Sequence, residues 1–66
     1  MNANTVRRML KDREGEHIVV DVICPNGSYE IIEGTYQGYH KATSFAYPRI
    51  RVNDEWIACK YIEAIH

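Results

Sequence analysis

The chain has little of what would mark a specialised class of protein. No apolar run approaches the ~18 residues that a membrane-spanning helix needs. No apolar segment follows Met1 in the manner of a secretory signal, so we expect a cytoplasmic chain. Eight Lys and Arg stand against nine Asp and Glu, a formal charge of −1, which excludes a surface that is basic throughout. The net charge does not exclude a local stripe of basic residues.

Side chains that carry catalysis or bind metals are few and scattered. Cys24 and Cys59 fit neither a zinc nor a redox spacing, and a cytosolic setting disfavours a disulfide between them. The three histidines form no close pair that would preorganise a metal site. So small a chain also has little concave surface to enclose a substrate. We therefore expect no enzymatic activity, no cofactor and no metal.

What is present is an ordinary globular mixture, with 45% hydrophobic and 26% charged residues. We expect one domain over residues 1–66. A core of this size rarely supplies more than ~3–5 kcal/mol of stability. Such chains usually gain support from a disulfide, a metal or a partner. Because the first two are disfavoured here, we expect self-association or a protein partner.

The domain is predicted to begin with an amphipathic helix over residues 3–14. Val6, Met9 and Leu10 have the i, i+3, i+4 spacing of a single apolar stripe. Gly15 can end the helix in a left-handed conformation. An isolated helix this short is marginal in water, so its stripe must pack against the rest of the domain.

Short strands are predicted to follow the helix. They are expected at about 17–24, 29–40, 49–53, 55–59 and 61–65. Asn-Gly between the first two is the strongest short hairpin signal, and Gly34 and Gly38 predict a bulge or bend in the second. The pattern predicts a mainly β fold (α+β by content), a small SH3-like barrel of four or five antiparallel strands. The alternative is an open sheet with the helix across one face.

Two parts of the chain resemble known families of small barrels. The N-terminal helix, residues 22–27 and the run Gly34–Tyr39 (Gly-Thr-Tyr-Gln-Gly-Tyr) resemble the first half of an Sm-like domain, Hfq included. The closing run, with Trp56-Ile57 and then Ile62 and Ile65, is similar to the last strands of that fold and to the end of YolD-like proteins. The first resemblance implies an SH3/Sm-like barrel and RNA binding. The second implies a small accessory protein that binds another protein.

An apolar surplus predicts a protein-binding surface. The first two strands are largely apolar on both faces, more than one small core can bury unless the helix covers the excess. Five Tyr are also present, a residue type common at binding sites, whereas the single Trp56 is predicted to lie in the core. We expect a non-enzymatic binding module that engages a protein partner or a second copy. Its predicted partner-binding residues are Val19, Ile23, Ile31, Tyr36 and Tyr39.

The alternative function is single-stranded nucleic-acid (RNA) binding. Cations track phosphates and aromatic rings stack on unpaired bases, and the second half of the chain interleaves the two. The residues of this alternative are Tyr39, Lys41, Tyr47, Arg49, Arg51 and Lys60. The competing interpretation is that the two Arg only solubilise an exposed strand, while Phe45 and Tyr47 fold back on the barrel.

Overall fold

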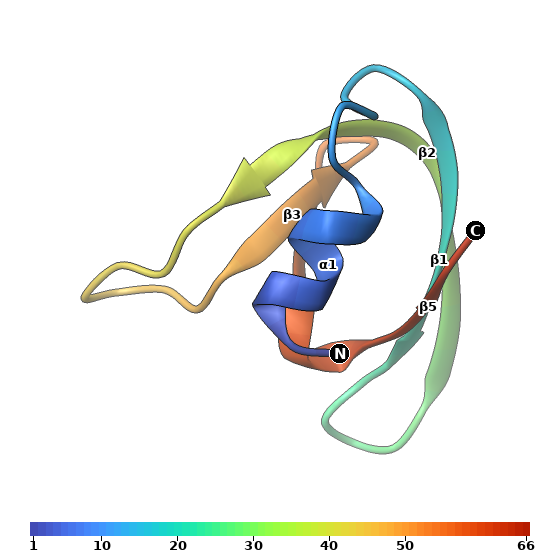
Figure 1. Ribbon diagram of the computed structural model, residues 1–66. Helices are drawn as coiled ribbons and strands as arrows, with labels where there is room; N and C mark the ends of the chain where they lie inside the picture. The colour runs from blue at the N-terminus through green and yellow to red at the C-terminus, as the bar shows by residue number, and fades with distance from the viewer.

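The computed structural model describes residues 1–66 as one helix on a five-stranded antiparallel sheet (Figure 1). The elements are α1 (Ala3–Met9), β1 (His17–Ile23), β2 (Tyr29–His40), β3 (Arg49–Val52), β4 (Glu55–Ala58), the 3₁₀ turn η1 (Cys59–Tyr61) and β5 (Ile62–Ile65). The strand order is β4-β3-β2-β1-β5, so β4 and β5 are free edges and the sheet is not closed. The prediction of a small, mainly β domain is confirmed. With seven residues, α1 is too short to span a lipid bilayer.

The hairpin of β1 and β2 forms where the Asn-Gly pair predicted it. Gly27 has a φ of +87°, in the left-handed region that residues with a Cβ rarely adopt. The Asn26 side chain completes the turn, because its Oδ1 accepts a hydrogen bond from the N–H of Ser28 at 3.0 Å. The turn therefore sets the register in which β1 and β2 pair.

β2 bends and belongs to both halves of the sheet. Its first part pairs with β1 and its last part pairs with β3, and the register shifts between Tyr36 and Tyr39. Gly38 lies in this bulge with a φ of +117°. A Cβ on Gly34 would lie 2.6 Å from the Cβ of Asn53, so this glycine permits the close approach of the β3–β4 turn. The predicted bend is confirmed, and it curves the sheet around α1.

The core lies between α1 and the inner face of the curved sheet. Its twelve buried residues are all apolar, and no charged or polar side chain is buried with them. They are Val6, Leu10, Ile18, Val20, Val22, Tyr36, Ile50, Val52, Ile57, Cys59, Ile62 and Ile65. The strands thus alternate inward and outward as their sequences predict, and the outward side chains of β1–β2 and of β3–β4 are left for other contacts.

The prediction that the helix extends to residue 14 is wrong, since α1 ends at Met9. Asp12 has a φ of +61°, which a right-handed helix cannot contain. The N–H of Gly15 donates to the carbonyl oxygen of Tyr36 at 2.8 Å, so the backbone approaching β1 pairs with β2. The helix is shorter because these residues satisfy their backbone groups in turns and against the sheet.

The predicted apolar stripe of the helix is also narrower than expected. Val6 and Leu10 are buried beneath α1, whereas the Met9 side chain is 41% exposed. Met9 is the last residue of the helix, and it is not among the residues in the core or packed against it. Two side chains therefore anchor α1 on the sheet.

Two predictions about aromatic residues are wrong. Tyr36, predicted to contact a partner, is only 4% exposed, because it continues the inward alternation of β2. Trp56, predicted to lie in the core, is 47% exposed, because Ile57 takes the inward position on β4. Tyr39 is partly buried against the core rather than free on the surface.

Candidate functional site

The outward side chains of β3 and β4 gather in one cluster. Arg51 pairs directly with Trp56 across the two strands, and Arg49 pairs with Ala58 on one side and with His40 of β2 on the other. These positions face away from the core because the residues between them, such as Ile50 and Ile57, are buried. The local reason is the two-residue turn at 53–54, which brings β4 back beside β3 with no offset.

Trp56 lies at the centre of this cluster. The guanidinium carbons of Arg49 and Arg51 are 4.6 Å and 4.8 Å from the centroid of its ring. The His40 ring meets the indole edge-on, with centroids 4.7 Å apart and an interplanar angle of 81°. The negative face of an indole attracts cations. Trp56 therefore orders two guanidinium groups that have little help from carboxylates, since Oδ1 of Asp54 is 3.8 Å from Arg51.

A second stacked pair extends the cluster. The ammonium nitrogen of Lys60 is 3.5 Å from the centroid of the Tyr47 ring, and the Tyr47 side chain is 64% exposed. Arg49 joins the two groups, because its Nη1 donates to the carbonyl oxygen of Tyr47 at 3.4 Å. We call this surface the aromatic–cationic face. It consists of His40, Tyr47, Arg49, Arg51, Trp56 and Lys60.

The predicted nucleic-acid residues are brought together only in part. Tyr47 and Lys60 join the two arginines on the aromatic–cationic face. Tyr39 does not, because it packs against the core, with the guanidinium carbon of Arg7 5.1 Å from its ring centroid. Lys41 is exposed just beyond β2. The sequence reasoning missed His40 and Trp56, although counting back across the two-residue turn would have placed Trp56 opposite Arg51.

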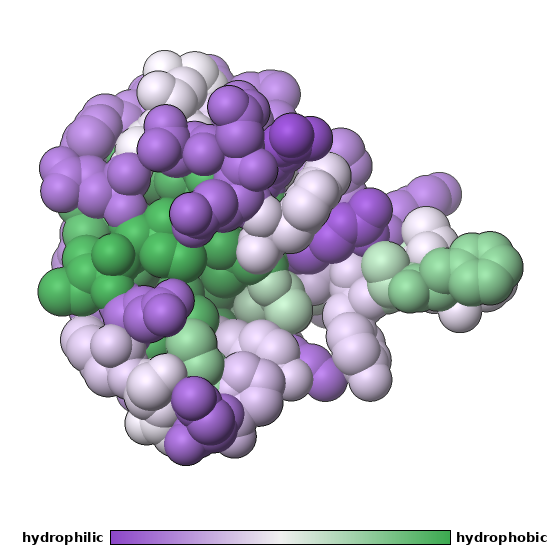
Figure 2. All heavy atoms as spheres, turned by 180° about the vertical axis from the view of Figure 1, so that it is seen from behind, coloured by the Kyte–Doolittle hydropathy of each residue, from purple (hydrophilic) through white to green (hydrophobic).

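The loop between β2 and β3 projects away from the body (Figure 1), and we call residues 41–48 the arm. Phe45 near its end is 98% exposed. The N–H of Thr43 donates to the carbonyl oxygen of Ala46 at 2.9 Å, and the N–H of Phe45 donates to Oγ1 of Thr43 at 3.1 Å. Figure 2 shows the projection with an apolar tip, separate from the body. Phe45 therefore does not fold back on the sheet, whereas Tyr47 contacts Lys60 of the body.

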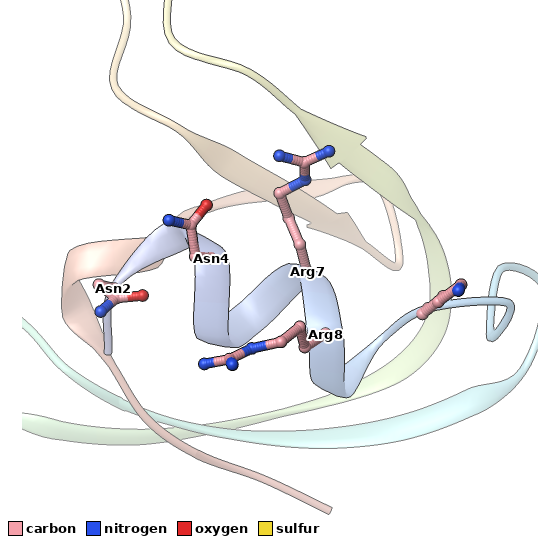
Figure 3. Close-up of a pocket in the computed structure, with 5 residues that line it drawn as sticks. Asn2, Asn4, Arg7 and Arg8 are labelled. Atoms are coloured by element: carbon pink, nitrogen blue, oxygen red, sulfur yellow. The ribbon is translucent and has the colours of Figure 1, made fainter.

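α1 carries a second group of cations. Arg7, Arg8 and Lys11 line a shallow hollow together with Asn2 and Asn4. Figure 3 shows Arg7 and Arg8 leaving α1 in different directions, and the guanidinium of Arg7 lies over the ring of Tyr39. The ion pairs of the chain involve other basic residues. No aromatic side chain lines this hollow, which distinguishes it from the aromatic–cationic face.

An apolar surface lies on the outer side of β1 and β2. Ile23, Tyr29 and Ile31 are 41%, 58% and 63% exposed, and Val19 on the same side is half-buried. Tyr29 pairs with Ile23 across the strands. We call Val19, Ile23, Tyr29 and Ile31 the apolar face. Tyr36 and Tyr39, predicted to belong to this surface, lie elsewhere.

Asp21 lies within the apolar face, paired with Ile31. A ring nitrogen of His66 is 3.2 Å from its Oδ2, and this contact holds the pKa of Asp21 below its usual value. The Tyr29 hydroxyl acts in the same direction, and the neighbouring carboxylate in turn raises the pKa of Tyr29. The face is therefore apolar with an ionised carboxylate inside it.

No protein-family model, no curated protein and no solved structure matches this chain. The two surfaces are therefore interpreted from their own chemistry. One combines cations with aromatic rings, and the other combines aliphatic side chains with carboxylates.

Proposed function

We propose that the protein is a non-enzymatic binding module and that its aromatic–cationic face binds single-stranded nucleic acid. The observation that carries the proposal is the exposed Trp56 with two guanidinium groups stacked on it. The Tyr47–Lys60 pair beside it repeats the same combination. The face holds three permanent positive charges on a chain whose formal net charge is −1.

The chemistry of the ligand follows from these groups. Guanidinium and ammonium groups attract phosphates, and the 3.8 Å contact between Arg51 and Asp54 is the only ion pair that involves the cations of this face. Aromatic rings and guanidinium planes stack on bases that are unpaired. A duplex hides its bases, so single strands are the class of nucleic acid that uses both kinds of group.

A fluorescence titration tests the proposal. Oligo(U) and oligo(dT) of about 15 nucleotides, within the span that small single-strand-binding domains cover, are added at low salt. The chain has one Trp, so quenching of its fluorescence reports on this face alone. Neutralising three phosphates predicts a slope of about −2 for log affinity against log salt. A duplex of equal length is expected to bind more weakly.

Matched variants locate the interface. Arg49→Ala with Arg51→Ala is expected to weaken binding at least ~10-fold, on the scale of one stacked base. Arg8→Ala with Lys11→Ala removes the same charge from α1 and is expected to change affinity little. If both double variants lost the same affinity, the binding would depend on overall charge and not on the aromatic–cationic face. No binding at low salt would refute the proposal.

The apolar face favours a second candidate function, docking to another protein. Ile23, Tyr29 and Ile31 lie exposed side by side, and exposed apolar patches of this kind commonly mark partner sites. Carboxylates of Asp21, Glu33 and Glu63 accompany them. Two copies would bring these carboxylates together, so the charges favour a different protein with basic groups around an apolar centre.

Parallel capture experiments test the docking surface. Ile31→Lys adds a charge at an exposed position and is expected to abolish capture of the partner without changing the urea midpoint. Phe45→Lys makes the same change outside the apolar face and is expected to keep the partner. Mass measurement in solution is expected to give a monomer. A partner retained by Ile31→Lys would exclude this surface, and a stable dimer would favour self-association.

We also propose that the sheet is an open form of a small SH3/Sm-like barrel. The bend in β2, the strand order and the 3₁₀ turn between β4 and β5 support this arrangement. Because neither edge has a further partner strand, outward amides of β4 and β5 are expected to exchange rapidly with solvent. Slow exchange at both edges would contradict an open sheet in solution.

A further inference from the structure

We infer that the arm is part of the nucleic-acid site and that Phe45 stacks on a base of the bound strand. This inference rests on the proposed function of the aromatic–cationic face and extends that face to a stacking residue beyond the sheet. It assigns a role to the most exposed large apolar residue, which belongs neither to the core nor to the two described surfaces.

The exposure of Phe45 is the first observation. The chain contains a single Phe, and this residue is 98% exposed, more than any other large apolar residue. Burying a Phe side chain stabilises a fold by the hydrophobic effect, so the fold gives up that stabilisation at this position. A base could cover this ring, since every base presents a flat π-face.

The position of the arm is the second observation. The arm begins directly after His40 and ends directly before Arg49, and both residues belong to the aromatic–cationic face. The C-terminal end of the arm is fixed to the body by two contacts. The Tyr47 ring stacks on Lys60, and the Cys59 N–H donates a hydrogen bond to the Pro48 carbonyl oxygen at 3.0 Å. Figure 1 shows the arm continuing the line of β2 and β3 outward. A strand bound on the face can therefore continue along the arm.

The charge of the arm is the third observation. Residues 41–48 contain Lys41 and no acidic residue, so nothing on the arm repels a phosphate chain. The carboxylates of the apolar face lie instead on β1, β2 and β5. The arm is therefore compatible with the ligand proposed for the face and unlike the acidic side of the molecule.

Oligonucleotide length separates the arm from the face. A strand of about four nucleotides, the smallest site size of comparable domains, is expected to occupy the face alone, and one of about 15 is expected to reach Phe45. Phe45→Ala is therefore expected to weaken binding of the longer oligo(dT) about 5- to 100-fold, the effect of one stacked base. It is expected to leave the shorter oligo(dT) unchanged. Ser44→Ala, a neighbouring change on the arm, is the matched control.

Aromatic replacements distinguish stacking from simple apolar contact. Phe45→Tyr is expected to retain the affinity, whereas Phe45→Leu keeps an apolar side chain and is expected to lose it. Phe45→Trp combined with Trp56→Phe moves the only indole to the arm, and its fluorescence is expected to be quenched by the longer strand.

The possible failures are distinguishable. If the unaltered chain binds the longer strand but Phe45→Ala binds it equally well, the arm inference is wrong and the proposed function stands. If Phe45→Leu binds as tightly as the unaltered chain, stacking by Phe45 is wrong. If the unaltered chain binds neither strand at low salt, the inference falls together with the proposed function.

Discussion

Arg51 and Trp56 face each other across β3 and β4, with the guanidinium carbon 4.8 Å from the ring centroid. Such a pair contributes ~0.5–1 kcal/mol at an exposed site. A double-mutant cycle with Arg51→Ala and Trp56→Ala, measured by urea unfolding, is expected to return a coupling of about this size. The same cycle between Arg8 and Trp56 serves as the control and is expected to give none. A zero coupling for the first pair would mean that the indole does not hold the guanidinium in solution.

Leu10 and Met9 are neighbours with different burial, 2% and 41% exposed. Leu10→Ala removes an anchor of α1 and is expected to cost ~2–5 kcal/mol. Since a core of this size supplies only ~3–5 kcal/mol, that variant is expected to be largely unfolded by circular dichroism. Met9→Ala is expected to stay folded, with a urea midpoint near that of the unaltered chain. Equal losses at both positions would contradict the way α1 packs.

Gly34 is expected to be intolerant of even a methyl group. Its added Cβ would lie 2.6 Å from the Cβ of Asn53, so Gly34→Ala is expected to destabilise the fold by ~1–3 kcal/mol. Asn53 has a φ of +50°, which glycine adopts freely, so Asn53→Gly removes the clashing atom without straining the turn. The double variant is therefore expected to recover part of the loss in urea unfolding. A Gly34→Ala variant as stable as the unaltered chain would show that the two segments are farther apart.

Tyr36 predicts a loss of stability at high pH. Burial raises the pKa of Tyr36 above its ordinary 10.0, and the nearby Glu14 adds to the shift. The fold thus favours the protonated phenol, so this contribution is complete below pH 10.0 and is lost as pH rises through the folded-state pKa. Tyr36→Phe cannot ionise, so the loss of stability above pH 10.0 is expected to be smaller in that variant. Identical alkaline unfolding of both chains would contradict the burial of Tyr36.

Several features could be predicted because they depend on neighbours in the chain. Asn26-Gly27 forms its turn through local hydrogen bonding and a left-handed glycine. The alternation of β1 and β3 sorts their side chains between core and surface wherever they pair. The predictions that were wrong concern residues whose conformation depends on residues distant in the sequence. The end of the helix could not be predicted from neighbouring residues, because the backbone that follows Met9 forms a hydrogen bond with Tyr36 of β2.

The amino-acid sequence by itself determined a small, mainly β chain with one helix, a hairpin at Asn-Gly and a bent second strand, since periodicity and turn chemistry are local properties. Only the tertiary structure decided that the side of β3 and β4 that carries Arg51 and Trp56 would face solvent while Tyr36 entered the core. Which face of a strand is buried depends on its register with neighbouring strands and on where α1 rests. The exposure of Phe45 was decided in the same way, because none of the twelve core residues between α1 and the sheet comes from the arm.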